Sequence, residues 1–364
     1  MISRPLSLVA GAVLFLITPA VAQTSRYVLK GDSVAIYNLV GELRVEAGSG
    51  GDVVVDVQRG GDDAARLHVE SGPLRGRETL RVIYPDDVIV MPDWGRGWNT
   101  TLRVRDDGTF GDEGWDDEGR GGGRGRGRFR EGREVRITGR SREGLEAFAD
   151  LHVTVPAGKN VGLSLGVGKA FVTNVDGVIR VSVASADVSA DRTRGTLRIS
   201  TGSGNVDLRD GAGDVSLETG SGDITAAGTS GTRLRLNTGS GGVTLRDGKA
   251  SDLKVETGSG DIEATNTAGD QVSFETGSGN VDVSLVTTFR SLHIETGSGD
   301  VTLKVPSNLG AEVDLDTGSG DIDLGGLTLQ VRRLEHDHIT GTLGDGSGKL
   351  SVETGSGNVK LQKL

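Results

Sequence analysis

Residues 253–264, with the sequence LKVETGSGDIEA, contain the pattern that decides the fold. Before the glycines the inward residues fall on odd positions, from Leu253 to Thr257, and after them on even positions, from Ile262 to Ala264. Alternation with a period of two indicates β-strands that bury one face. The change of parity falls within Gly-Ser-Gly, where glycine allows backbone angles that other residues avoid. The stretch therefore predicts two short strands joined by a tight corner.

The tetrapeptide T-G-S-G of this stretch recurs through the second half of the chain. Successive copies are separated by 18 to 21 residues, except for a final step of 37 residues that is close to two periods and contains a degenerate copy at residues 344–348. A fixed short period is typical of repeat proteins, in which each unit buries its apolar face against its neighbours. The copies begin at Thr201, Thr219, Thr238, Thr257, Thr276, Thr296, Thr317 and Thr354.

Stacking the copies explains how such short strands acquire a buried face. Each strand would pair in parallel with its copy one coil above, ~4.8 Å away, and each period is too short to hold a crossover helix. The sequence therefore predicts an all-β fold, a single-chain parallel β-solenoid (β-helix) with coils of about 19 residues. A propeller of β-hairpins is the alternative, although its blades need ~40–50 residues each.

Stacking in chain order would also fix the sequence of the interior columns. One column would run from Leu217 to Leu315 and then to Val352, so the C-terminal coil would end the stack. Lys360 and Lys363 on that coil would then discourage pairing with another chain, because charged residues blunt an exposed strand edge.

Composition divides the chain into four segments. The first resembles a secretory signal peptide, with Arg4, an apolar run and an A-x-A-like cleavage site at residues 20–22. The second alternates like strands and forms either the first coils or a small β-domain on the end of the stack. The segments are the signal peptide 1–22, the N-terminal β region 23–91, a charged Gly/Arg-rich low-complexity insertion 92–142 and the β-solenoid repeat domain 143–364.

The composition also limits the partners and the compartment. The 364 residues carry a formal net charge of −11, which disfavours attraction to nucleic acid or anionic lipid. The chain has no cysteine, which excludes disulfides, thiolate nucleophiles and cysteine-type metal sites. With the leader removed and no further apolar span, the sequence predicts a periplasmic or extracellular protein, at the cell surface in the latter case.

The insertion contains the candidates for a binding segment. Acidic residues gather in its first part and arginines among glycines in its second. The arginines suggest an arm that grips a polyanion, whereas a loop whose two halves neutralise each other is the simpler interpretation. All three tryptophans of the chain, Trp94, Trp98 and Trp115, lie here and would either stack on sugar rings or anchor the loop.

Two columns of polar residues flank the repeated corner. Acids precede the threonine in most copies, and Asp or Asn follows the second glycine. Stacked carboxylates repel one another, so basic neighbours such as Lys254 and His293 or a bound Ca²⁺ would have to offset the charge. The candidate metal ligands are Asp261, Asp300 and Asp321, although solvated ladders without any cofactor are the default interpretation. The sequence contains neither H-E-x-x-H nor a P-loop motif.

The E-T-G-S-G-[DN]-[IV] copies at Glu218, Glu256, Glu275 and Glu295 resemble the bacterial "putative adhesin" families of β-strand repeats, including the head GIN-domain type. The run DLHVTVPAG at 150–158 is similar to the usual entry to that repeat. The resemblance covers nearly all of the chain after the leader except the insertion. It implies an exported β-solenoid with no catalytic residues.

These observations lead to one main functional expectation and two alternatives. We expect an exported, non-enzymatic adhesin or envelope-binding scaffold, whose repetitive faces suit a cell-surface polymer such as polysaccharide. A self-assembling structural protein is the first alternative, because open coil ends expose strand edges. A polysaccharide-acting β-helix enzyme is the second, since carboxylates line the stack.

Overall fold

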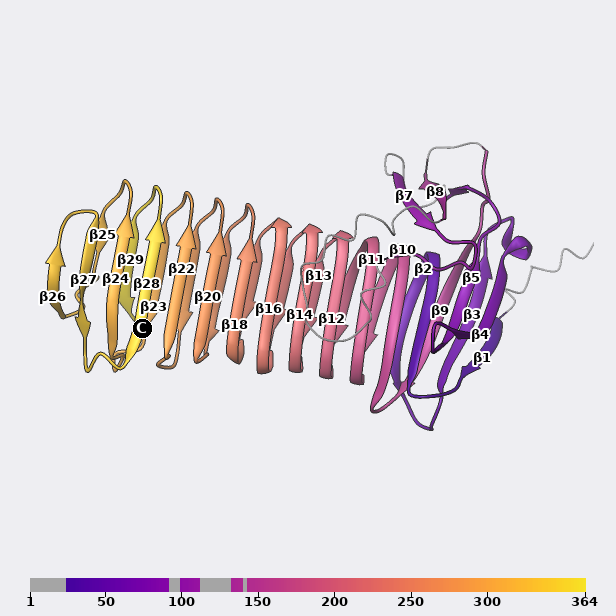
Figure 1. The fold of residues 1–364 in the computed structure, drawn as a ribbon, viewed down its shortest axis with the longest axis horizontal. Helices are drawn as coiled ribbons and strands as arrows, with labels where there is room; N and C mark the ends of the chain where they lie inside the picture. Colours follow the sequence, from indigo (N-terminus) through magenta and orange to yellow (C-terminus); the bar gives the residue numbers. More distant parts are fainter. Residues whose placement is uncertain (1–23, 92–98, 112–131, 140–142) are drawn as a thin grey trace, which may run out of the picture.

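The computed structural model describes residues 24–91, 99–111, 132–139 and 143–364. Strands account for nearly all of the regular structure, and they form a long stack with a broader head at its N-terminal end (Figure 1). The predicted all-β parallel solenoid is confirmed. Within the described ranges no helix is long and apolar enough to cross a membrane.

The head consists of antiparallel strands that flank the start of the stack. β1 pairs with β3, β3 pairs with β9, and β4 pairs with β5. A small separate sheet has the order β6-β8-β7. The head elements are β1 (Thr24–Leu29), β3 (Val53–Gly60), the short 3₁₀ helix η1 (Ala64–Arg66), β4 (His68–Leu74), β5 (Arg77–Ile83), β6 (Val88–Val90), β7 (Asn99–Val104), β8 (Arg133–Thr138) and β9 (Phe148–Pro156).

The stack begins with three coils that are single long strands and continues with coils of two strands each. The long strands are β2 (Ser33–Gly48), β10 (Lys159–Thr173) and β11 (Asp176–Asp191). The paired strands are β12 (Arg194–Ser203) with β13 (Val206–Arg209), β14 (Ala212–Ser221) with β15 (Ile224–Ala227), β16 (Ser230–Ser240) with β17 (Val243–Arg246), β18 (Lys249–Thr257) with β19 (Ile262–Thr267), β20 (Gln271–Thr276) with β21 (Val281–Leu285), β22 (Ser291–Thr296) with β23 (Val301–Val305), β24 (Ala311–Thr317) with β25 (Ile322–Asp323), and β28 (Gly348–Thr354) with β29 (Val359–Lys363).

Aliphatic side chains fill the space between the two strands of each coil. Val255 and Phe274 are fully buried on the first strands of neighbouring coils, and Ile262 is buried on a second strand. The parallel register places equivalent residues directly over one another, as in the pairs Val255 with Phe274 and Ile262 with Val281. The two predicted interior columns are therefore present.

The order of the last coils differs from the prediction. The C-terminal coil β28–β29 lies between β22–β23 and β24–β25, so Thr354 pairs with both Thr296 and Thr317. Val352 therefore precedes Leu315 in the column, and the predicted chain order is wrong at this end. Residues 344–348 do not form a coil, because they turn the chain from β27 (His338–Leu343) back into the stack.

An antiparallel hairpin, not the C-terminal coil, closes the far end of the stack. β27 pairs antiparallel with β24, and β26 (Leu329–Leu334) pairs antiparallel with β27 (Figure 1). Lys360 and Lys363 consequently belong to an internal coil, and the prediction that they blunt the end of the stack is wrong.

The N-terminal end repeats this arrangement. β9 and β10 are consecutive in the chain, yet β2 lies between them and pairs in parallel with both. At each end of the stack a strand from near one end of the chain is thus inserted between elements that follow each other in sequence. The ladder is completed only when these segments have entered it.

The threonine of each T-G-S-G corner ties neighbouring coils together. Thr257 is buried, and its hydroxyl donates a hydrogen bond of 2.9 Å to the carbonyl oxygen of Gly241 in the preceding coil. Thr354 makes the same bond to Gly299, and Thr317 to Gly357, which follows the revised coil order. The repeated threonine is therefore explained by a hydrogen bond that links each of these corners to the neighbouring coil.

We expect Thr257→Val to lower the free energy of unfolding by about 1 kcal/mol, because valine keeps the shape but cannot donate the buried hydrogen bond. Chemical denaturation measures this change. Ser259→Ala is the control, since Ser259 is exposed in the same corner and its change should stay within about 0.5 kcal/mol. Equal effects of the two substitutions would contradict the assigned role of the threonine.

Candidate functional site

The Asp/Asn column after the corner forms a ladder of backbone caps. The Oδ1 atom of Asp261 accepts a hydrogen bond of 2.7 Å from the backbone N–H of Asn280, and Oδ1 of Asn280 accepts one of 2.9 Å from Asp300. Asp300 caps Asn358 in the same way, and Asn358 caps Asp321. These side chains are thus acceptors for the next coil.

The three candidate metal ligands lie on different coils of this ladder. Asp261 and Asp300 each use one carboxylate oxygen on a backbone N–H, while Asp321 receives such a cap at its own N–H from Asn358. Among the described residues there is no group of three or more His, Cys, Asp or Glu side chains able to hold a metal ion. The calcium site remains a prediction without a geometry to support it.

We expect addition of Ca²⁺ or of a chelator to leave the melting temperature unchanged, because the described residues form no group able to hold the ion. A bound ion would raise the melting temperature, since a ligand of the folded state stabilises it by mass action. Asp261→Ala should instead cost about 1 kcal/mol through the lost cap, and Asp261→Asn should retain it. A calcium-dependent rise in melting temperature that Asp261→Ala abolishes would contradict this assignment.

The candidate binding residues Trp94, Trp98 and Trp115 lie outside the described residues.

Serine is the one member of the corner motif whose side chain has no shared structural role. Its backbone carbonyl accepts an inter-coil hydrogen bond, as Ser259 does from Gly241, but the side chain is exposed. The register lines these hydroxyls up in a continuous row with a spacing of ~4.8 Å. In stack order the row contains Ser203, Ser221, Ser240, Ser259, Ser278, Ser298, Ser356 and Ser319.

A column of acids runs beside this row on the first strands. The ammonium of Lys254 lies 2.7 Å from Glu256 and 3.4 Å from Glu275, so it bridges two coils. Its hydrogen bond to Glu256 raises the pKa of Lys254, while a hydrogen bond from Ser273 and then the charge of Lys254 lower the pKa of Glu275. His293 lies 3.5 Å from Glu295. The predicted offset by basic neighbours is present at these residues.

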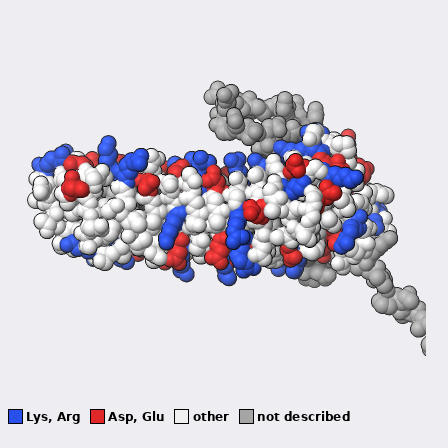
Figure 2. All heavy atoms as spheres, turned by 90° about the horizontal axis from the view of Figure 1, so that it is seen from below, with Lys and Arg blue, Asp and Glu red and all other residues white. Residues whose placement is uncertain are grey.

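Charged side chains are distributed unevenly over the surface. Figure 2 shows Lys and Arg among Asp and Glu along the long borders of the stack and around the head, with mostly uncharged residues between the borders. The borders of the stack therefore present charges of both signs rather than one continuous field.

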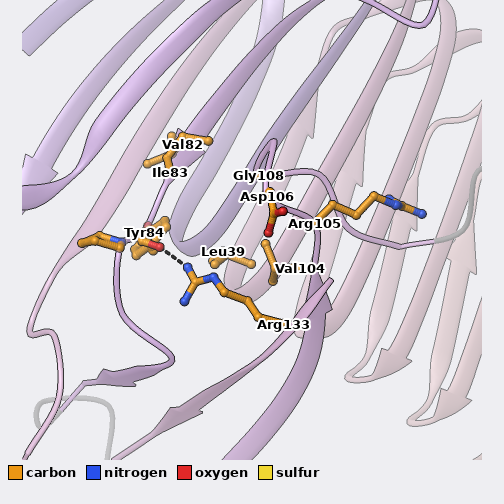
Figure 3. A pocket seen from close by; sticks show the side chains of 10 residues that line it. Leu39, Val82, Ile83, Tyr84, Val104, Arg105, Asp106, Gly108 and Arg133 are labelled. Carbon is orange, nitrogen blue, oxygen red and sulfur yellow. Dashed lines mark hydrogen bonds between the residues drawn. The ribbon is translucent and has the colours of Figure 1, made fainter. Parts of the chain in front are cut away.

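A pocket in the head lies where β2 and β5 meet the small sheet. The guanidinium of Arg133 donates to the carbonyl oxygen of Tyr84 at one side of the pocket, and Arg105 extends away from the other lining residues (Figure 3). Arg133 also forms an ion pair with Asp87. The other residues that line the pocket, including Leu39, are largely apolar, so the pocket offers little reactive chemistry.

A buried polar network beneath this pocket was missed by the sequence analysis. The hydroxyl oxygen of Tyr84 lies 2.9 Å from Asn38 Oδ1 and 2.9 Å from the carbonyl oxygen of Val40, and these two acceptors share its hydrogen. Burial raises the pKa of Tyr84. The Asn38 amide donates 2.6 Å to the carbonyl of Ala149. The only signal was a lone asparagine in the mostly apolar run 34–40. The network joins β2 to the head, and both Asn38 and Tyr84 are buried.

Comparison with known proteins gives a family match and several structural likenesses. The family model described as Toastrack DUF4097 matches residues 126–362. A search of curated proteins finds no match. A cell adhesion protein of Clostridium sporogenes, described as "putative", has 11% identity and a TM-score of 0.23 over 94% of this chain and 99% of its own.

Two further solved structures are each described as a "putative adhesin". The protein from Parabacteroides distasonis has 12% identity and a TM-score of 0.33 over 94% of this chain and 96% of its own. The protein from Bacteroides fragilis has 11% identity and a TM-score of 0.29 over 93% and 96%. Superpositions at these scores carry no argument about ligands or activity.

Proposed function

The chain belongs to the toastrack DUF4097 family, and from that premise we propose that it is an exported, non-enzymatic scaffold that binds a repetitive polymer of the cell envelope, such as a polysaccharide. The observation that supports this most is the uninterrupted row of exposed serine hydroxyls beside the acid column. A row with one hydroxyl per coil offers many weak and equivalent contacts to a polymer whose own groups repeat, and weak contacts made together give avidity.

The roles of the motif residues support the same proposal. Threonine, both glycines and Asp or Asn hold the coils together, whereas serine is retained at an exposed position that the stack leaves free. The predicted leader at 1–22, which lies outside the described residues, supports export to the periplasm or the cell surface.

The alternatives find less support. Two outer strands are interrupted: β4 contains Pro73, which cannot donate to a ladder, and the register of β26 shifts between Val331 and Arg333. These features disfavour assembly through β4 and β26, whereas β1, which pairs with β3 on one side only among the described strands, has no such interruption. For an enzyme, the G-x-S-x-G sequence at 162–166 lies inside β10 with Ser164 buried, not on a turn that presents a nucleophile.

A screen against envelope fractions and purified glycans tests the proposal. We expect binding to at least one polymer that weakens with shortening of the polymer chain and when Ser240, Ser259 and Ser278 are all replaced by bulky glutamine. The control replaces Thr225, Thr244 and Thr302, on the second strands β15, β17 and β23, by glutamine. No binding to any envelope polymer, or reproducible cleavage of one, would contradict the proposed function.

A further inference from the structure

Four arginines form a trough on the outer face of the first strands, next to the head. Arg180 on β11, Arg198 on β12, and Arg233 and Arg235 on β16 surround a floor of small residues that includes Ser200 and Ser216. The parallel register places Arg180, Arg198, Ser216 and Arg235 in one column across four successive coils. Long side chains around short ones create the hollow.

The arginines of the trough differ in how far their charge is compensated. The Arg198 side chain is exposed and makes no hydrogen bond or ion pair within the described part of the chain. Arg180 donates 2.7 Å to the neutral amide oxygen of Asn160. The guanidinium of Arg235 lies 3.5 Å from the carboxylate of Asp252, and that of Arg233 lies 3.4 Å from the carboxylate of Asp214. All four side chains are about half exposed. Such exposed pairs are weak and are readily exchanged for another anion.

The geometry points to this trough as the site at which the protein binds an acidic polysaccharide, through ion pairs of Arg198 and Arg235 with carboxylate or phosphate groups on the polymer. The inference rests on the proposed function and specifies its ligand as anionic. Guanidinium groups form two parallel hydrogen bonds with such anions, which gives the contact direction as well as charge.

The spacing of charges favours a polysaccharide over nucleic acid. Arg198 and Arg235 are separated by two coils, or ~9.6 Å, and Asp214 and Glu218 lie beside the intervening Ser216. A polymer with anions separated by neutral hydroxylated stretches avoids those carboxylates. A nucleic acid strand carries a charge every ~3.4 Å and would meet them. The serines of the floor provide donors and acceptors for hydroxyl groups.

Binding of hyaluronan, which carries one carboxylate per disaccharide, measured beside neutral dextran of matched length and duplex DNA, tests the inference. We expect hyaluronan to bind, and its affinity to fall as salt is raised, because released counterions contribute to the affinity. Arg198→Ser with Arg235→Ser should weaken binding by about tenfold or more, since each lost charged hydrogen bond is worth ~1.5–3 kcal/mol. Because both side chains are exposed, we expect the variant to fold like the unaltered protein, and circular dichroism verifies this.

Arg209→Ser with Arg246→Ser is the matched control, because these arginines lie on β13 and β17, the second strands of the same two coils. We expect that variant to bind hyaluronan like the unaltered protein. Equal losses in both variants, or tighter binding of DNA than of hyaluronan, would overturn the inference. Binding to dextran or another neutral polymer alone would overturn it while leaving the proposed function standing, and binding to no polymer would overturn both.

Discussion

Replacing Gly260 with asparagine is expected to destabilise the protein by several kcal/mol. Gly260 has φ +156°, and a Cβ atom built on it would lie 2.0 Å from the carbonyl oxygen of Gly241 in the preceding coil. The backbone strain contributes ~1–3 kcal/mol and the overpacking a further ~1–3 kcal/mol. Neither backbone can retreat, because each is paired to coils on both sides. Denaturant unfolding measures the loss.

Gly242→Asn is the matched control for this substitution, in the neighbouring coil. Gly242 occupies an Asp/Asn position, and a Cβ atom added to it would lie 3.5 Å from the nearest atom, an ordinary contact. An asparagine there would restore the missing cap for the N–H of Asp261, so we expect a gain of about 0.5–1.5 kcal/mol. Similar effects at Gly242 and Gly260 would show that backbone approach does not limit the corner.

Deletion of residues 348–364 is expected to unfold the far end of the stack, not merely to shorten it. The deletion removes the coil on which β22 and β24 both pair, with buried Leu350, Val352, Val359 and Leu361. At ~1.5–3 kcal/mol for each buried side chain, the loss approaches the whole stability of an ordinary domain, about 5–15 kcal/mol. Limited proteolysis should then cut residues 306–347 while the preceding coils resist.

Two point substitutions in the same coil distinguish the loss of core packing from the loss of chain length. Val352→Asp places a charge in the core and should mimic the deletion, whereas exposed Lys360→Ser should not. A deleted chain whose residues 311–343 remain protected would contradict the inserted position of the C-terminal coil, because stacking in chain order would leave those residues intact.

The sequence was sufficient to predict the coil but not the order of the coils. The period-two alternation on both sides of each corner determines which residues face inward, and this depends only on local chain geometry. The copy at Thr354 is nearly identical to its neighbours, so the motif itself permits it to pair with any of them. Its position is decided by the irregular segments around β26 and β27, whose antiparallel pairing occupies the free edge of β24.

The Asp/Asn column shows a similar limit for the candidate site. The carboxylate oxygens of Asp261 and Asp300 were interpreted as metal ligands, but such oxygens can also accept hydrogen bonds from backbone N–H groups. The presence of Asn280 and Asn358 in the same column was the signal for this second role. Asparagine accepts from an N–H as aspartate does, but it lacks the charge that favours a cation. The arginine trough escaped notice because Arg198 and Arg235 are far apart in the sequence, and only the register of the coils places them on one face with Ser216 between them.

Engineered cysteine pairs test the stacking of the corners most directly, because the natural chain has no cysteine. Ser298→Cys with Ser356→Cys places the thiols on adjacent coils, where Gly299 donates 2.9 Å to the carbonyl of Ser356. A spacing of ~4.8 Å falls within the Cα separation of a disulfide, ~4.4–6.8 Å. The account predicts rapid intramolecular disulfide formation in this pair and none for Ser298→Cys with Ser319→Cys, two coils apart. A disulfide in the second pair but not in the first would contradict it.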